Sequence, residues 1–353
     1  MSRQTRRRFL AGAAGLAAGL AGCATGVRDT PDPVPPSETT AEADSRYAAA
    51  FERTIESVAF VGAAGGSGSG FVHDGVIVTN QHVVGDAETA DIRFENGEWR
   101  SAGVTATDVY ADLAVLSTDI PEYARPLSFV DSIPAVGTEV LALGSPFGLE
   151  SSVSSGIISG RNRSLPNEQT GFAIPNTVQT DAGLDPGNSG GPVVTMEGQV
   201  TGVAVAGAGT SVGFAVSPLL AGRVLPELIE TGNYDHPFLG IRLIEVTPTV
   251  AEANGLGQPR GVLVIETTED APSGTELRGV TGERTVDGRT VPVGGDVLVE
   301  LAGTAIRSNA DLGTALALEL SPGDRVPATV IRDGEQREIT VAIGARPDPG
   351  ERA

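Results

Sequence analysis

Short apolar runs, separated by glycines and polar residues, fill the sequence between residues 47 and 232. Runs of this kind are typical of β-strands, because a helix would need longer stretches with apolar residues three or four positions apart. Residues 71–78 carry an Asp-Gly pair between two apolar runs, which is a strong short-range signal for a β-hairpin. Many short strands joined by glycine-containing turns predict β-barrels for this region. A helix is expected after them at residues 218–231, where Gly232 would end it.

A serine enclosed by glycines occurs at residues 187–192, which read Gly-Asn-Ser-Gly-Gly-Pro. A serine hydroxyl is a weak nucleophile unless a turn exposes it, a nearby base accepts its proton and backbone amides bind the oxyanion that forms. Glycines allow the close backbone approach that two converging amides around Ser189 require. Glycine, asparagine and serine are also common in ordinary turns. The segment alone therefore fits either a nucleophile turn or a structural turn.

Two candidate partners for Ser189 precede it in the sequence. His82 follows an apolar run, and Asp112 begins another. Taken singly, such a histidine is usually a surface or core side chain, and such an aspartate is often a turn residue. The order His, Asp, Ser is that of chymotrypsin-type enzymes and differs from the orders in subtilisins and α/β-hydrolases. Together the three residues predict a catalytic triad, whereas His73 and His236 have no such support.

Four segments together resemble the HtrA/Deg serine proteases. They read Thr-Asn-Gln-His-Val-Val at 79–84, Asp-Leu-Ala-Val-Leu at 112–116, Gln-Thr-Asp-Ala at 179–182 and Pro-Gly-Asn-Ser-Gly-Gly-Pro at 186–192. The resemblance implies a mainly β fold, with a chymotrypsin-like double β-barrel protease domain at 47–232 and a small α+β PDZ domain at 237–346. His82 and Asp112 would lie in the first barrel and Ser189 in the second, with the active site in the cleft between them.

The resemblance also implies a role for each residue of the site. Ser189 would attack the peptide carbonyl, His82 would act as general base and then as general acid, and Asp112 would orient the imidazole. The backbone amides of Gly187 and Ser189 would form the oxyanion hole, with Asn188 between them holding the turn. These roles predict a serine endopeptidase that cleaves unfolded or damaged exported proteins through an acyl-enzyme.

Substrate specificity is expected at residues 201–207, which match the wall of the family's substrate pocket. Val203, Ala204 and Val205 carry no charge. The resemblance therefore implies cleavage after small or medium aliphatic residues, with the substrate adding as a strand along this edge.

Residues 238–243, which read Phe-Leu-Gly-Ile-Arg-Leu, resemble the carboxylate loop and edge strand of a bacterial-type PDZ domain. In such domains backbone amides capture the C-terminal carboxylate of a peptide while the strand pairs with the peptide. The resemblance assigns this binding to Phe238, Leu239, Gly240 and Ile241. A purely packing role for these residues is the alternative. An extra polar loop at about 279–292 departs from the family pattern and leaves the shape of the groove open.

The N-terminal residues predict export. An arginine cluster precedes an apolar run at 11–22 that is too short to span a membrane, as in a twin-arginine signal. The run ends in Leu-Ala-Gly-Cys, which resembles a lipobox and would place a lipid anchor on Cys23, at the outer face of the cell membrane. A site for ordinary signal peptidase is the alternative. Residues 1–22 would then be the signal, and 23–46 a flexible tether rich in proline and acidic residues.

Tyr47 and Phe51 stand four positions apart in a short helix expected at 47–55. In the family, aromatic residues before the first barrel strand help to join three subunits, so the resemblance implies a homotrimer. Packing of the two rings on the subunit's own barrel explains the pattern equally well.

The composition narrows the range of partners. The 353 residues carry a formal net charge of −21 and include no lysine, yet 40% of them are hydrophobic, so a folded chain is expected. The acidity argues against nucleic acid, whose phosphates bind basic surfaces. It resembles instead the acidity of halophilic proteins, with an ordinary acidic exported protein as the alternative. No cofactor and no metal site are expected, because Cys23 is the one cysteine and the three histidines stand far apart.

Two further functions fit the same motifs. One is a catalytically latent PDZ protein that binds peptides or acts as a chaperone, and the other is a protease dedicated to one signalling substrate. All three catalytic residue types are present, which favours an active enzyme.

Overall fold

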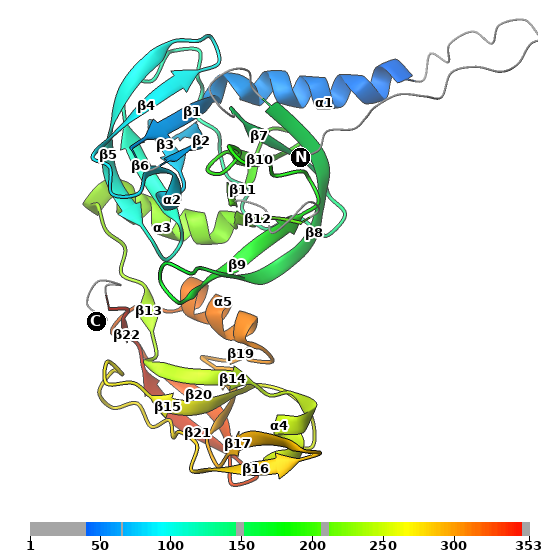
Figure 1. Ribbon diagram of the computed structural model, residues 1–353, viewed down its shortest axis with the longest axis vertical. Coiled ribbons are helices and arrows are strands. Elements are labelled where there is room, and N and C mark those ends of the chain that lie inside the picture. The colour runs from blue at the N-terminus through cyan, green and yellow to red at the C-terminus, as the bar shows by residue number, and fades with distance from the viewer. Residues whose placement is uncertain (1–39, 65, 146–151, 206–211, 348–353) are drawn as a thin grey trace, which may run out of the picture. The chain divides into compact units, whose positions relative to one another are not determined.

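The computed structural model describes residues 40–64, 66–145, 152–205 and 212–347. Residues 41–353 form one compact unit. Its described part contains two closed β-barrels and, after them in the chain, a separate sheet with helices α4 and α5 (Figure 1). The predicted export signal, Cys23 and most of the predicted tether lie outside the described residues. No helix of the described ranges is long and apolar enough to cross a membrane.

Six strands close the first barrel. In spatial order they are β1 (Val58–Ala63), β2 (Gly66–His73), β3 (Val76–Thr79), β6 (Leu113–Ser117), β5 (Trp99–Asp108) and β4 (Thr89–Phe94). Branched and aromatic side chains fill its core, where Ile77, Phe94 and Leu116 are buried. The turn between β2 and β3 has positive φ at Asp74 and Gly75, which confirms the hairpin that the Asp-Gly pair predicts.

Six further strands close the second barrel. In spatial order they are β7 (Glu139–Gly144), β8 (Ser152–Pro166), β9 (Ala173–Thr180), β12 (Gly213–Val216), β11 (Val200–Val205) and β10 (Pro192–Thr195). Helix α3 (Pro218–Thr231) follows, with the bounds that the sequence predicts. The Ser217 hydroxyl accepts a hydrogen bond of 3.1 Å from the amide of Leu220 at its start, and Gly232 ends it.

Packing fixes the two barrels relative to each other. The largest buried apolar cluster contains Phe71 and Leu113 from the first barrel, Leu141 and Val194 from the second, and Leu225 from α3. Because this core is shared, side chains carried by different barrels are held at constant positions in the cleft between them.

Helix α1 (Thr40–Thr54) begins before the position that the sequence predicts. The last residues of the predicted tether are therefore helical, which fits Ala41, Glu42 and Ala43, since alanine and glutamate are good helix formers. A 3₁₀ turn, η1 (Ile55–Ser57), leads from it to β1. Tyr47 and Phe51 pack against the shared core cluster, and the Tyr47 hydroxyl donates a hydrogen bond of 2.6 Å to Glu139. These contacts fit the second interpretation of the aromatic pair, packing on the subunit's own barrel.

The C-terminal domain is a sheet covered by helices. Its strands run in the order β14 (Ile241–Glu245), β15 (Val262–Thr267), β18 (Val297–Leu301), β20 (Arg325–Arg332) and β21 (Glu335–Ala342), and the short strand β19 (Thr304–Ala305) pairs with β18. Its helices are α4 (Pro248–Ala253) and α5 (Asn309–Glu319), and β13 (Pro237–Phe238) pairs with β22 (Gly344–Ala345). Leu298, Leu312 and Val330 lie in its core. Strand β14 is at the edge of the sheet, as the sequence predicts for the peptide-binding strand.

The extra polar loop expected at about 279–292 is largely a β-hairpin, which corrects the sequence expectation. Its strands are β16 (Gly282–Val286) and β17 (Arg289–Val293), joined by Asp287 and Gly288, both at positive φ. The hairpin packs against the α4 region, where Arg284 donates a hydrogen bond of 2.6 Å to the carbonyl of Ala253. Polar flanking residues hid the strand pattern, although an Asp-Gly pair marked the turn.

Candidate active site

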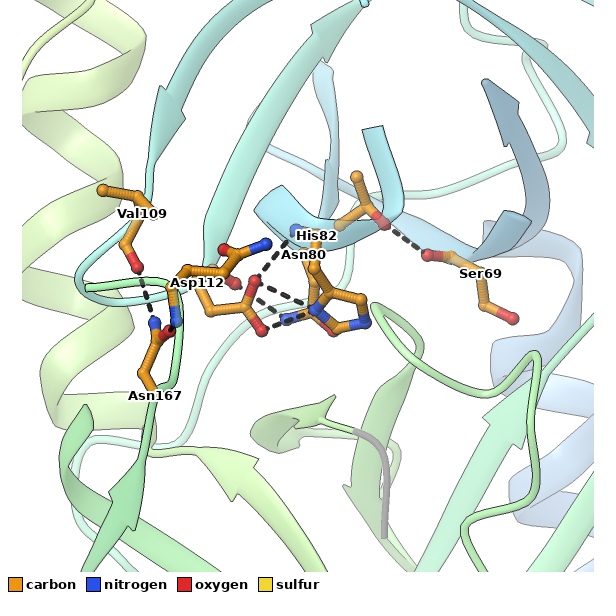
Figure 2. A network of polar contacts seen from close by, with 8 residues as sticks. Ser69, Asn80, His82, Val109, Asp112 and Asn167 are labelled. Carbon is orange, nitrogen blue, oxygen red and sulfur yellow. Dashed lines mark hydrogen bonds and ion pairs between the residues drawn. The ribbon is translucent and has the colours of Figure 1, made fainter. Parts of the chain in front are cut away.

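His82 and Asp112 meet at one end of the first barrel. His82 lies in the short helix α2 (Gln81–Val84) directly after β3, and Asp112 ends the turn between β5 and β6. The imidazole Nδ1 lies 2.8 Å from Asp112 Oδ2 and 3.0 Å from Oδ1, and the Asp112 side chain points at the ring (Figure 2). The carboxylate also accepts a hydrogen bond of 3.0 Å from the amide of His82. With Nδ1 donating to the carboxylate, a neutral imidazole has Nε2 as its acceptor.

The side chains of Asp112 and His82 differ in their exposure to solvent. The side chain of Asp112 is 7% exposed, whereas that of His82 is 34% exposed. A buried carboxylate interacts strongly with the ring because little water screens it. The exposed part of the ring is available to a substrate in the cleft.

Asn80 holds the turn that carries Asp112, and sequence reasoning did not single it out. Its side-chain nitrogen Nδ2 donates a hydrogen bond of 2.8 Å to the carbonyl of Asp112 (Figure 2). The side chain of Asn80 is buried. Asn80 stands two residues before His82, so one segment positions both members of the pair. The Thr-Asn-x-His spacing is the signal that could have identified it.

The turn around Ser189 comes from the second barrel and packs against the first. The amide of Ser69 donates a hydrogen bond of 2.8 Å to the carbonyl of Ser189, and the Ser69 hydroxyl donates one of 2.7 Å to the carbonyl of Gly187. A Cβ placed on Gly190 would lie 3.0 Å from the amide nitrogen of Asn80 and closer still to Thr79. The Ser189 turn therefore lies against the segment that leads to His82. Within the described residues no hydrogen bond joins the Ser189 hydroxyl to the imidazole.

The amides of the Ser189 turn divide into two groups. Those of Asn188, Gly190 and Gly191 donate to the carbonyls of Asp185, Ala204 and Asn188. The amides of Gly187 and Ser189 form the second group: among the described residues, no acceptor lies within hydrogen-bonding geometry of either amide. These are the two donors that the resemblance assigns to the oxyanion hole.

Asn188 points away from the cleft. Its side chain is buried, and its Oδ1 accepts a hydrogen bond of 3.1 Å from the Ser152 hydroxyl. It also packs so closely on Gly144 of β7 that a Cβ there would collide with its amide. Asn188 is therefore placed to hold the turn rather than to touch a substrate.

The predicted pocket wall lies on β11 next to the Ser189 turn. The side chains of Val203 and Ala204 are fully buried in core clusters. Their backbone is also paired on both sides, because β11 lies between β10 and β12 in the closed barrel and Ala204 exchanges hydrogen bonds with Gly190 and Gly191. Val205 is partly buried. The carbonyl of Ala204 accepts a hydrogen bond of 2.8 Å from the amide of Gly190, which ties the wall to the nucleophile turn.

A second candidate site is a groove of about 730 Å³ beside the edge strand of the C-terminal sheet. Residues of the segment 237–243 line it, together with Leu312 and Leu316 of α5 and, from the second barrel, residues 170–173. Gly240 has φ of 65°, and a Cβ there would collide with the backbone of Ala271, so this turn requires glycine. Phe238 and Leu239 are largely buried, which fits the packing role, whereas Gly240 and Ile241 present backbone at the start of β14.

Comparison with known proteins also divides the chain into two domains. Residues 66–203 match the trypsin-like peptidase domain, and residues 237–343 match the PDZ domain. The chain is 36% identical over 297 residues to the probable periplasmic serine endoprotease DegP-like of Pseudomonas fulva, covering 81% of this chain and 57% of that protein. It is 34% identical over 292 residues to Protease Do-like 1, chloroplastic, of Arabidopsis thaliana, covering 80% of this chain and 64% of that protein. The chain thus spans little more than half the length of the curated relatives it matches.

Solved structures of HtrA-type proteases are also similar to this chain. The structure described as HtrA-type protease AlgW with tripeptide superposes with a TM-score of 0.68 at 29% identity, covering 86% of this chain and 98% of that one. The resemblance to HtrA/Deg proteases is thereby confirmed: the chain carries a trypsin-like peptidase domain followed by one PDZ domain, and its relatives are DegP-like serine endoproteases and HtrA-type proteases.

Proposed function

We propose that this protein is a serine endopeptidase that uses Ser189 as its nucleophile. The observation that supports this best is the Asp112–His82 pair, with Nδ1 on the carboxylate, beside a glycine-bounded serine turn from the other barrel. Each part of this arrangement has a use in acyl transfer, and the parts come from segments far apart in the sequence.

The reaction follows from these positions. The Ser189 hydroxyl rotates toward Nε2 of His82 as substrate fills the cleft, loses its proton to that nitrogen and attacks the peptide carbonyl. The buried Asp112 carboxylate stabilises the imidazolium that forms. The Gly187 and Ser189 amides donate hydrogen bonds to the oxyanion, and one such donor is typically worth about 3 kcal/mol in the transition state. His82 then protonates the leaving amine, and a water activated by His82 releases the acyl group from Ser189.

Substrates of this enzyme would be extended peptide segments. A substrate that adds as a strand at Val205, the end of β11, must be an unfolded stretch of chain, which supports unfolded or damaged exported proteins as substrates. The wall at 203–205 carries no charge, and its one partly exposed side chain is that of Val205, which supports cleavage after small or medium aliphatic residues. Profiling with a peptide library checks this preference, and cleavage after arginine would contradict it.

The PDZ groove would bind C-terminal peptides. An edge strand, a glycine turn before it and the apolar residues of α5 supply the backbone donors, the bend and the side-chain pocket that such binding uses. Titration with a C-terminal peptide and with its amidated form tests this proposal. Equal affinity for the two forms would show that the free carboxylate is not recognised.

The decisive experiment for the protease proposal is digestion of casein by wild type, Ser189→Ala and Ser101→Ala. Ser101 is exposed on β5 and serves as a matched control. We expect Ser101→Ala to digest casein at the wild-type rate and Ser189→Ala to be inactive. Equal activity in all three would refute the assignment of Ser189.

A second candidate function is a latent peptide-binding or chaperone protein. The missing hydrogen bond between the Ser189 hydroxyl and His82 favours it, because a latent site holds its nucleophile out of line. Peptide binding by the PDZ groove without casein digestion, with or without added C-terminal peptide, would identify this state. A protease dedicated to one signalling substrate would instead cleave few of the proteins offered to it.

Three properties of the molecule in the cell are also proposed. Export is supported by the periplasmic relatives and by the arginine cluster before an apolar run. Lipid anchoring through Cys23 at the outer face of the membrane rests on the Leu-Ala-Gly-Cys motif, and mass spectrometry of membrane-extracted protein would detect the lipid. A homotrimer rests on the position of Tyr47 and Phe51 before the first barrel, and light scattering would measure the mass of the assembly.

A further inference from the structure

A buried histidine–aspartate pair lies outside the proposed triad. His236 Nε2 lies 2.6 Å from Asp108 Oδ2, and the two side chains are 5% and 4% exposed. His236 stands between α3 and β13, and Asp108 is the last residue of β5. A carboxylate buried this deeply is stable only when it is paired and hydrogen-bonded, so the contact is a specific feature of the fold.

Asp108 uses its other carboxylate oxygen on the backbone that leads to Asp112. Its Oδ1 accepts a hydrogen bond of 2.7 Å from the amide of Ala111, which is fully buried. The next residue, Asp112, has φ of 54°, a conformation that costs a non-glycine residue about 1–3 kcal/mol. Such a backbone persists only where its surroundings hold it. Asp108 therefore supplies part of the restraint that keeps Asp112 in place.

Other elements hold the same turn at other points. Asn80 binds the carbonyl of Asp112, and the Asn167 amide nitrogen donates a hydrogen bond of 2.9 Å to the carbonyl of Val109 (Figure 2). His236 acts on the turn through Asp108 and comes from the segment just before the PDZ groove. The turn that carries Asp112 is thus held by contacts from three distant parts of the sequence.

The surroundings of His236 fix its ring against Asp108. The ring packs edge-on against Tyr110 and Tyr234, with centroids 5.3 and 4.7 Å away. Burial raises the pKa of Tyr234, so this phenol is uncharged at neutral pH. Arg223 donates a hydrogen bond of 2.9 Å to the Tyr234 hydroxyl, and the amide of Arg346 donates one of 2.8 Å to the carbonyl of His236. The imidazole cannot leave Asp108 without displacing these neighbours.

We propose that His236 is a positioning residue for the catalytic aspartate: it holds Asp108, and Asp108 holds the turn that presents Asp112 to His82. This inference rests on the proposed protease function. Without the imidazole, the Asp108 carboxylate loses its buried partner, turns toward other donors and releases the amide of Ala111. The backbone before Asp112 then relaxes, and the carboxylate of Asp112 moves relative to His82.

The test compares kcat and KM of full-length wild type, His236→Ala and His236→Gln on a chromogenic peptide, below the unfolding midpoint of each variant. We expect His236→Ala to lower kcat about 10- to 100-fold, because a displacement of about 1 Å has effects of this size. KM should stay within about twofold, since binding groups are untouched. Glutamine should restore most of the activity, because its amide nitrogen can reach Asp108 as Nε2 does. His73→Ala is the matched control: His73 binds the carbonyl of Leu127 elsewhere in the first barrel, and this variant should keep the wild-type kcat.

If His236→Ala does not fold, His236→Asn replaces it, because asparagine is polar but too short to reach Asp108. An unchanged kcat in the Ala or Asn variant would overturn the proposal, as would an effect confined to KM or a loss in His236→Gln as large as in His236→Ala. A folded wild type that lacks Ser189-dependent activity would instead overturn the protease function and this inference with it. Measuring wild type alongside the variants separates the two failures.

Discussion

Gly190 lets two barrels meet at the site. Its φ is 84°, and a Cβ on it would collide with the carbonyl of Ser69 and the hydroxyl of Thr79. The absence of a side chain therefore brings the Ser189 turn of the second barrel against the end of β3, three residues before His82. Chemistry at Ser189 depends on this close approach as well as on the reacting groups.

Replacement of Gly190 by alanine should abolish activity and lower stability. The substitution adds backbone strain and also forces Ser69 and Thr79 apart from the turn. Gly75→Ala is a matched control, because Gly75 has φ of 80° but nothing within 4 Å of its Cβ position. Strain alone should cost Gly75→Ala about 1–2 kcal/mol and leave kcat/KM unchanged. Urea unfolding and peptide hydrolysis measure both effects, and equal losses in the two variants would contradict the steric argument.

At the scale of elements, a buried ion pair joins β18 and β20 of the PDZ domain to its loops. The guanidinium of Arg332 binds both carboxylate oxygens of Asp296 at 2.6 and 2.7 Å, and the Asp296 side chain is fully buried. Hydrogen bonding to Asp296 raises the pKa of Arg332, so the guanidinium stays charged at any ordinary pH. Asp296 also accepts a hydrogen bond of 2.9 Å from the amide of Arg278.

Replacement of Arg332 by leucine should therefore lower the free energy of unfolding by about 3–5 kcal/mol, because it leaves a carboxylate buried without a countercharge. Arg337→Leu is the control. Arg337 pairs with Glu335 at 3.4 Å on the exposed face, and such a pair is worth about 1 kcal/mol or less. Denaturant unfolding of both variants checks this, and a loss below about 1 kcal/mol in Arg332→Leu would contradict it.

We predict that removal of the hairpin β16–β17 leaves the peptide groove intact. The residues that line the groove come from other segments, and the hairpin packs on the α4 region. The amide of Thr281 donates a hydrogen bond of 3.0 Å to the carbonyl of Val293, so the two ends of the hairpin already lie together. We expect a chain with residues 282–293 replaced by two glycines to bind C-terminal peptides within about threefold of wild type. Loss of binding, measured by calorimetry on a variant that still unfolds cooperatively, would show that the hairpin shapes the groove.

At the scale of the whole molecule, the net charge of −21 sets how stability responds to salt. Like charges on the surface repel one another, and salt shortens their range from about 10 Å at 0.1 M to about 3 Å at 1 M. We expect the unfolding midpoint to rise by about 5 °C or more between 0.1 and 2 M KCl. Differential scanning fluorimetry across a salt series measures this. A maximum at low salt would contradict the proposed adaptation to salt.

Much of the fold could be predicted from the sequence because its signals are local. Asp-Gly pairs mark three of the hairpins, at 74–75, 287–288 and 333–334, and Gly232 marks the end of α3. The sequence pattern predicts β1 and β5 poorly. Glycine and alanine interrupt the apolar pattern of β1, and β5 contains many polar residues. Their places depend on pairing with strands distant in the sequence, which no local pattern contains.

The reacting residues of the site could be predicted from motifs, but their supports could not. Ser69 and Asn80 act through hydrogen bonds that exist only once the barrels have closed. Asp108 and His236 are 128 positions apart, and no motif assigns a role to His236. Long-range contacts of this kind are set by packing, whereas a motif specifies only its own neighbourhood.

The most direct test of the account is intact-protein mass spectrometry after treatment with a fluorophosphonate, which reacts with an activated serine. We expect one adduct per wild-type chain, located on Ser189, and a labelling rate lower by about 10³-fold or more in His82→Ala, because without the imidazole the hydroxyl keeps its proton. An unlabelled Ser189 in the folded wild type with peptide in the PDZ groove, or equal labelling rates in wild type and His82→Ala, would contradict it.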